Sequence, residues 1–266
     1  MTTLEIFEEA ALAAGAAILE IYRAGPTVST KADHSPVTEA DERAEEIILA
    51  HLRRHCPEIA VVAEESVAAG RVPEPSDRFI LVDPLDGTKE FIARRDEFTV
   101  NVALVEGGIP TAGIVYAPAC GLAYVGDCQG AYRLTIGADF VVKERQAIGA
   151  RPVGDPPVAV ASRSHNTPET ADFLRTAGIS DIRLIGSSLK FCLLAEGKAD
   201  VYPRFGRTME WDTAAGDAVL RAAGGSTVTL DGRPLVYGKR QQLSDSDFAN
   251  PDFIAWGRRA GSGNPT

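Results

Sequence analysis

An apolar run that ends in two aspartates limits what this chain can fold into more than any other feature. The segment reads FILVDPLDGT from residue 79, and Asp83 and Asp86 stand three positions apart. A carboxylate beside an apolar core is costly unless its charge is compensated. Pro84 fixes one backbone dihedral and therefore stiffens the turn between the two acids. The pattern predicts a buried strand that holds two carboxylates in a defined relation.

The residues after the second aspartate favour a phosphate site. Gly87 and Thr88 open a predicted short helix, and free N–H groups at a helix start bind phosphate well. A plainer interpretation is that Asp-Pro and Asp-Gly are two turn signals at the end of a strand. Carboxylates that bind a metal ion and amides that bind a phosphate would then lie side by side, as a metal-dependent phosphate site requires.

Acidic residues also stand at the ends of other predicted elements. Glu64 follows the apolar run of EIAVVAEES, Asp212 begins the predicted helix WDTAAGDAV, and Asp41 forms a capping-box pattern with Thr38. A solvated turn or a helix cap explains each of them singly. It does not explain why four acidic sites at element ends occur in one chain.

Hard divalent cations such as Mg²⁺ prefer oxygen ligands and are usually held by a few carboxylates together with substrate phosphate. Two such ions roughly 3.5–4 Å apart stabilise both the attacking and the leaving oxygen of phosphoryl transfer. We therefore hypothesise a pair of magnesium ions held by four carboxylates: Glu64, Asp83, Asp86 and Asp212. Asp83 would be the ligand that bridges the two ions.

Composition excludes several other classes of protein. The chain has 266 residues and a formal charge of −10, which argues against a nucleic-acid binder because such proteins need a basic face. The four cysteines form no CxxC pair and do not indicate zinc. The N-terminus lacks the basic start of a signal peptide, and no apolar stretch reaches membrane-spanning length. A cytoplasmic protein without an integral membrane span is expected.

The order of predicted elements suggests two domains. A Gly/Pro-rich stretch near residues 149–157 marks the boundary, giving an N-terminal α+β metal-binding domain over 1–152 and a C-terminal α/β domain over 153–266 that completes the site and ends in a mobile tail. Helices are predicted at 3–24, 39–56, 167–177, 188–196 and 211–224. Strands are predicted near 58–66, 79–88, 98–118 (a hairpin), 121–134 (two strands), 158–162, 181–185, 199–204 and 226–230.

Several motifs together resemble one family. In chain order they are KADHSPVTEAD, AEES, DPLDGTKEFI, SRSH, GSSLKFCLLAEGKADVYPRFG and WDTAAG. They resemble the lithium-sensitive, magnesium-dependent phosphatase superfamily that includes inositol monophosphatase, and within it the bacterial 3'(2'),5'-bisphosphate nucleotidases of the CysQ type. The resemblance covers about residues 1–240 and implies an α+β or α/β fold, the layered αβαβα sandwich of the sugar phosphatases.

The resemblance also implies an activity and a set of site residues. The activity is removal of the 3'-phosphate of adenosine 3',5'-bisphosphate to give AMP, with 3'-phosphoadenosine 5'-phosphosulfate as a second substrate, in sulfate assimilation and nucleotide recycling. Two or three Mg²⁺ ions are implied, and the catalytic residues would be Asp41, Thr88 and Glu64. The implied metal ligands are Glu64, Asp83, the Leu85 carbonyl, Asp86 and Asp212. All of them except Asp83 would also border the substrate, together with the Gly87 and Thr88 amides.

A nucleotide bisphosphate carries a second phosphate that needs its own cationic site. Ser187, Lys190 and Arg204 stand where this branch of the family holds that group, and an arginine fork suits phosphate. A surface arginine and a solvated helix lysine are the plain alternatives. The inositol branch tends to carry an acidic group here, so the basic residues favour a nucleotide.

Two rival functions stay open. One is a sister enzyme acting on inositol monophosphate or fructose 1,6-bisphosphate, and the other is a metal-gated nucleotide sensor without turnover. Thr88 and Asp41, which would activate water, are both present and favour catalysis. A monomer or a homodimer is expected, and relatives suggest peripheral association with the cytoplasmic face of the inner membrane.

Overall fold

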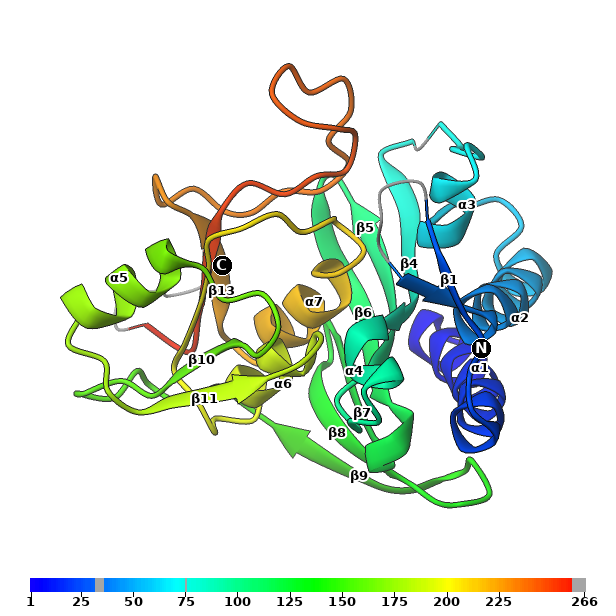
Figure 1. Cartoon of the computed structure of the whole chain (residues 1–266), viewed down its shortest axis with the longest axis horizontal. Coiled ribbons are helices and arrows are strands. Elements are labelled where there is room, and N and C mark those ends of the chain that lie inside the picture. Colours follow the sequence, from blue (N-terminus) through cyan, green and yellow to red (C-terminus); the bar gives the residue numbers. More distant parts are fainter. Residues whose placement is uncertain (32–35, 75, 260–266) are drawn as a thin grey trace.

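The computed structural model describes residues 1–31, 36–74 and 76–259, and they form five alternating layers of helices and sheets (Figure 1). The predicted αβαβα sandwich is confirmed. The helices are α1 (Thr3–Ala24), α2 (Glu39–His55), α3 (Glu64–Ala68), α4 (Thr88–Ile92), α5 (Pro168–Thr176), α6 (Leu189–Ala195) and α7 (Ala214–Ala222), with a 3₁₀ turn η1 (Pro118–Cys120).

The larger sheet contains seven strands in sequence order, β3-β4-β5-β6-β7-β8-β9. β3 and β4 run parallel, and every later neighbour is antiparallel. The strands are β3 (Ala60–Ala63), β4 (Arg78–Asp86), β5 (Thr99–Glu106), β6 (Ile109–Ala117), β7 (Leu122–Asp127), β8 (Gly130–Ile136) and β9 (Val142–Ile148).

The smaller sheet has five strands in the order β11-β10-β12-β14-β13. Its strands are β10 (Ala159–Ser162), β11 (Ile182–Ile185), β12 (Val201–Arg204), β13 (Ser226–Thr229) and β14 (Phe253–Trp256). β10, β11 and β12 are parallel, whereas β14 runs antiparallel to both of its neighbours. A separate two-stranded ribbon joins β1 (Val28–Thr30) to β2 (Pro36–Thr38).

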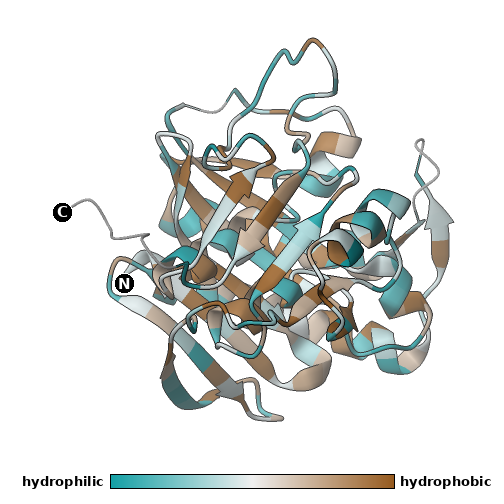
Figure 2. Ribbon diagram, turned by 90° about the vertical axis from the view of Figure 1, so that its left-hand side faces the viewer, coloured by the Kyte–Doolittle hydropathy of each residue, from teal (hydrophilic) through white to brown (hydrophobic). Residues whose placement is uncertain are grey.

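The larger sheet is buried on both faces, because successive apolar side chains of a strand point to opposite faces and each face packs against helices. On β4, Ile80 and Val82 belong to the core that α1 and α2 cover, whereas Phe79 and Leu81 belong to the core shared with α6 and α7. In Figure 2 the strands inside the molecule are largely brown, while much of the teal lies on loops and outer helix surfaces.

Helix α7 packs unusually close to the larger sheet. As a result, the residues that precede α7 lie near the end of strand β4. The close approach depends on Gly113 in β6, because a Cβ there would lie 2.9 Å from the Ala215 carbonyl oxygen. Side-chain contacts this short essentially do not occur, so a larger residue would push the helix outward.

Most elements confirm the sequence analysis, and five differ: β1, β2, α3, β9 and β14. The helix α3 begins at Glu64, whereas the strand predicted near 58–66 was expected to continue to residue 66. The segment expected to be a polar connection before residue 39 contains β1 and β2. β9 was missed because its exposed edge residues lack an apolar pattern. β14 was missed as well, although it lies inside the smaller sheet.

The tail predicted to be mobile comprises residues 257–266, and this range begins too early. Gly257 donates to the Asp200 carbonyl at 2.8 Å and Arg258 to the Arg151 carbonyl at 3.0 Å, while residues 260–266 lie outside the described part of the chain. The chain changes sheets between β9 and β10, near the proposed boundary. The division into two domains stays a prediction because α6 and α7 belong to a core that both sheets share. No helix among the described residues is long and apolar enough to cross a membrane.

Candidate active site

The two aspartates of β4 stand where this strand loses its regular pairing with β5. The register shifts between Asp83 and Asp86, and Asp83 Oδ1 accepts a hydrogen bond from the Leu85 amide at 3.0 Å. Gly87 follows with a φ of 92°, a conformation that glycine adopts without steric cost. The strand end therefore turns sharply, and α4 begins at Thr88 beside both carboxylates.

Three carboxylates from separate elements converge at this point. Oxygen atoms of Glu64, Asp83 and Asp212 all lie within 4.8 Å of one another. β3 and β4 are parallel neighbours, so their carboxyl ends lie at the same edge of the sheet. The turn before α7 brings Asp212 to that edge. The predicted convergence of these three acids is confirmed.

Asp86 lies beside this cluster and is held by hydroxyl and amide groups. Ser188 Oγ is 2.9 Å from Asp86 Oδ2 and 2.6 Å from the Asp212 carbonyl oxygen, so it can donate to either. Asn101 Nδ2 lies 2.9 Å from Ser188 Oγ and 3.5 Å from Asp86 Oδ2. Ser188 therefore connects two of the acidic segments that the sequence placed far apart.

Burial and mutual repulsion raise the pKa values of these acids. Burial is the main cause for Asp83, whose pKa lies well above its usual range, with further increases from Glu64 and Asp86. Burial also raises the pKa of Asp86, and together with repulsion from Asp86 and Glu64 it raises the pKa of Asp212 to about 8. A cation at this point would remove that repulsion. An all-oxygen donor set of this kind fits a hard divalent metal ion.

Lys31 supplies a positive charge on one side of the cluster. Its Nζ lies 2.6 Å from Glu64 Oε1 and 2.6 Å from Glu65 Oε1. The sequence analysis missed Lys31 even though it opens the KADHSPVT motif, because only the tertiary structure brings that residue to Glu64.

We expect the metal-free protein to become less stable as the pH rises from 5 to 8. The folded-state pKa values of Asp83, Asp86 and Asp212 exceed those of the unfolded chain, so stabilisation present below about pH 4 is lost as the pH rises through them. Since Asp86 and Asp212 are half-buried, we expect a loss of about 2 kcal/mol, which lowers the Tm by roughly 4–8 °C. Thermal melts in EDTA measure this, and Asp212→Asn should flatten the profile. A Tm that rises over this range would contradict the expectation.

Asp41 and Thr88 form a contact across the edge of the site. The Thr88 hydroxyl lies 3.1 Å from Asp41 Oδ1 and 3.3 Å from the Leu85 carbonyl oxygen. The other oxygen of Asp41 accepts from the Thr38 amide at 2.8 Å and the Thr38 hydroxyl at 2.7 Å, which confirms the predicted capping box. Burial raises the pKa of Asp41. The capping role and the contact with Thr88 thus use different oxygens of one carboxylate.

A cavity of about 450 Å³ opens beside the acids, and basic as well as acidic side chains line it. Lys190 and Arg204 line it and are both buried, which excludes the surface alternatives for these two residues. Burial lowers the pKa of Lys190 to about 8. Arg204 donates to the carbonyl groups of His165 and Arg207, both at 3.1 Å, and its Nε has no partner among the described residues.

All the predicted site residues lie at this cavity or beside it. Asp41 is next to Thr88 without lining the cavity, and Ser187 lines the cavity and accepts a hydrogen bond from Lys190 Nζ through its carbonyl oxygen. Five further residues were missed: Lys31, Asn101, Ser188, Tyr202 and Arg207. Ser188 stands next to the predicted Ser187 in the Gly-Ser-Ser sequence, and no sequence signal separates the two.

Comparisons with known proteins identify relatives along almost the whole chain. The model of the inositol monophosphatase family matches residues 2–255. The 3'(2'),5'-bisphosphate nucleotidase CysQ of Escherichia coli strain K12 is 45% identical over 242 residues, which is 90% of this chain and 94% of that protein.

Solved structures agree with this result. The crystal structure of CysQ from Bacteroides thetaiotaomicron, described as a bacterial member of the inositol monophosphatase family, has a TM-score of 0.78 and 39% identity, covering 98% of this chain and 99% of that one. The IMPase of Thermotoga maritima shares the fold at a TM-score of 0.75 and 23% identity, covering 96% of this chain and 92% of the other.

Proposed function

The chain belongs to the inositol monophosphatase family, and on this premise we propose that it is a 3'(2'),5'-bisphosphate nucleotidase. It would remove the 3'-phosphate of adenosine 3',5'-bisphosphate to give AMP and phosphate, and would also accept 3'-phosphoadenosine 5'-phosphosulfate. The observation that carries the proposal is a single cavity lined both by the three converging carboxylates and by the buried cations Lys190 and Arg204.

The proposed cofactor is Mg²⁺, as two or three ions. Its ligands would be Glu64, Asp83, the carbonyl of Leu85, Asp86 and Asp212, because this set offers hard oxygen donors whose mutual repulsion a cation would relieve. When bound, Mg²⁺ polarises phosphoryl oxygens and lowers the pKa of a coordinated water. Lithium is expected to inhibit the reaction.

The residues of the chain would orient the ester and accept the proton of the attacking water. The Thr88 oxygen would receive that proton while the Thr88 hydroxyl passes its own to Asp41 Oδ1, 3.1 Å away. The raised pKa of the buried Asp41 makes it a better proton acceptor than an exposed aspartate. The amides of Gly87 and Thr88 would donate to the phosphoryl oxygens as charge develops on them.

Lys190 and Arg204 would hold the second phosphate. Arg204 is positioned by two carbonyl groups, and its Nε is left without a partner among the described residues. The Lys190 Nζ is held by a hydrogen bond to the carbonyl oxygen of Ser187. The lysine side chain is therefore already fixed at the cavity before an anion binds. Acidic and basic side chains line the same cavity, which suits a substrate with two phosphates, one for the metal site and one for the cationic residues.

Arg204→Met is expected to lower kcat/KM for adenosine 3',5'-bisphosphate by about 10–100-fold, since a hydrogen bond to a charged group is worth about 1.5–3 kcal/mol. Hydrolysis of 3'-AMP, which lacks the 5'-phosphate, should change much less. Steady-state kinetics on both substrates measure this difference. Arg233→Met is the control, because Arg233 is exposed and lies outside this cavity. Equal losses on both substrates would remove Arg204 from the 5'-phosphate site.

The decisive experiment compares phosphate release from adenosine 3',5'-bisphosphate, inositol 1-phosphate and fructose 1,6-bisphosphate in Mg²⁺, with and without lithium. The proposal expects the nucleotide to be preferred by a large factor and lithium to suppress its turnover. Preference for either sugar phosphate would overturn the substrate assignment. A single-turnover experiment that binds the nucleotide but releases no phosphate would instead indicate the sensor. The cytoplasmic setting, a part in sulfate assimilation and the choice between monomer and homodimer stay predictions.

A further inference from the structure

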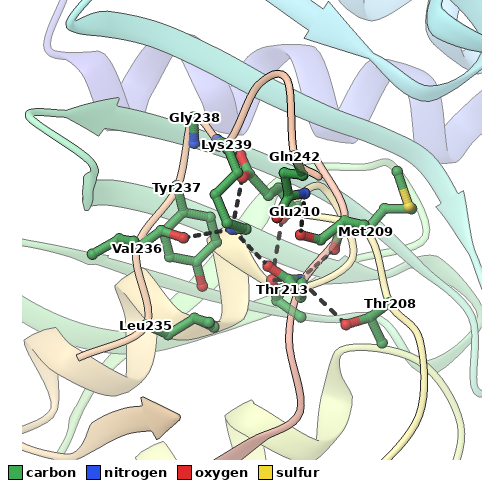
Figure 3. Close-up of polar contacts among 12 residues, drawn as sticks. Thr208, Met209, Glu210, Thr213, Leu235, Val236, Tyr237, Gly238, Lys239 and Gln242 are labelled. Carbon is green, nitrogen blue, oxygen red and sulfur yellow. Dashed lines mark hydrogen bonds and ion pairs between the residues drawn. The ribbon is translucent and has the colours of Figure 1, made fainter. Parts of the chain in front are cut away.

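A segment near the C-terminus lies over the turn that carries Asp212. This segment, residues 236–250, is called the strap here, and its two ends contact residues 208–213 (Figure 3). Within the strap, Gln242 Nε2 donates to the carbonyl groups of Ser246 at 2.8 Å and Ala249 at 3.0 Å. These bonds make the strap a closed loop with two ends that reach the turn.

The first end of the strap surrounds the carboxylate of Glu210. This side chain is fully buried, and it accepts hydrogen bonds from the amides of Gly238 at 2.6 Å and Lys239 at 2.9 Å. Lys239 Nζ lies 2.7 Å from Glu210 Oε1. A buried carboxylate is tolerated only with such compensation. The proposed reaction does not use Glu210. We therefore look for its role in the segment that its carboxylate binds, which is the strap.

The second end of the strap is fixed through Asn250 and Phe248. Asn250 Nδ2 lies 2.8 Å from the Met209 carbonyl oxygen, 3.0 Å from Thr213 Oγ1 and 3.2 Å from Thr208 Oγ1. The Phe248 carbonyl accepts from the Glu210 amide at 2.8 Å. The outer side of the turn is therefore bonded to the strap at both ends.

The inner side of the same turn determines where the Asp212 carboxylate points. The Met209 amide donates to Asp212 Oδ2 at 2.7 Å, and the Asp212 amide donates to the Met209 carbonyl oxygen at 3.2 Å. Met209 thus holds both the backbone and the carboxylate of Asp212. Asn250 binds the same carbonyl oxygen of Met209. Met209 therefore links the strap to Asp212 in the acidic cluster.

We propose that Glu210 and Asn250 are positioning residues for the metal site: through the strap they hold the Met209–Thr213 turn and thereby aim Asp212 at Glu64 and Asp83. This inference rests on the proposed function, because it assumes that the three carboxylates bind a divalent cation. Residues that orient metal ligands typically change metal affinity by 10–100-fold when they are replaced.

The test measures Mn²⁺ binding to the full-length, metal-free chain by electron paramagnetic resonance, together with the Tm of each variant. Glu210→Gln and Asn250→Ala should each raise the Kd for Mn²⁺ at least about tenfold. Asp200→Asn is the matched control: Asp200 is also a fully buried carboxylate, held by Arg151 and the Val158 amide away from the acids. It should lower the Tm comparably and leave the Kd within about twofold of wild type.

A second readout separates positioning from a general loss of structure. At saturating Mn²⁺ the turnover of both strap variants should return to within about threefold of wild type, because the chemistry of the site is unchanged once the cation is bound. Unchanged Kd values in the strap variants would overturn the inference, and Asn250→Ala decides alone if Glu210→Gln does not fold. A wild-type chain that binds no Mn²⁺ would overturn the proposed metal site itself, so the two failures are distinguishable.

Discussion

Replacing Asp83 with asparagine is expected to slow phosphate release from adenosine 3',5'-bisphosphate by about 10³–10⁴-fold. Asp83 is buried at the centre of the acidic cluster, within 4.8 Å of oxygens from Glu64 and Asp212. An amide cannot supply the negative charge that holds a divalent cation, and a bound cation contributes several kcal/mol to stabilisation of the transition state. The rate is measured by phosphate release at saturating substrate and Mg²⁺.

The same substitution should stabilise the protein in EDTA. In the metal-free state Asp83 is a buried acid whose pKa is raised by burial and by its acidic neighbours, so removing its charge relieves an unfavourable interaction. A variant that is inactive yet melts at a higher temperature than wild type cannot owe its inactivity to unfolding. Asp139→Asn is the control because Asp139 is exposed and forms a surface ion pair with Lys143. Full activity in Asp83→Asn would remove the acidic cluster from the mechanism.

Thr88→Val is expected to lower kcat by about 10²–10⁴-fold with little change in KM, the range typical of general acid–base groups. Valine keeps the shape of threonine but lacks the hydroxyl that lies 3.1 Å from Asp41 Oδ1. Asp41→Asn should have an effect of the same size, since its carboxylate would receive the proton. Steady-state kinetics give both values.

A double variant tests whether the two residues act as one unit. If Thr88 passes its proton to Asp41, the combined variant should be about as slow as either single variant, because groups that act together are not additive. Thr99→Val is the matched control: Thr99 is buried near the site, and its hydroxyl has no partner among the described residues. Additive losses, or equal loss in the control, would contradict the proton relay.

Short-range patterns predicted much of the fold. The helix starts at residues 3 and 39 follow from capping boxes, and the β5–β6 hairpin follows from Gly107 and Gly108, which both adopt positive φ. These features depend on neighbours within a few positions, so a single sequence contains them in full. β9 and β14 were missed for the opposite reason. β9 is an edge strand with exposed side chains, and β14 is defined by pairing with β12 and β13.

By itself the sequence determined the local geometry of the candidate site: Asp83, Pro84 and Asp86 at the end of an apolar strand, followed by Gly87 and Thr88. That information is local, because the strand period and the proline set which way the carboxylates point. Only the tertiary structure decided that Glu64 and Asp212 meet Asp83, and that Lys190 is buried rather than solvated. The pairing of β3 with β4 brings Glu64 to Asp83, and the close packing of α7 on the sheet brings Asp212 to both. Contacts between residues distant in the chain depend on packing of whole elements, and no spacing within one segment encodes them.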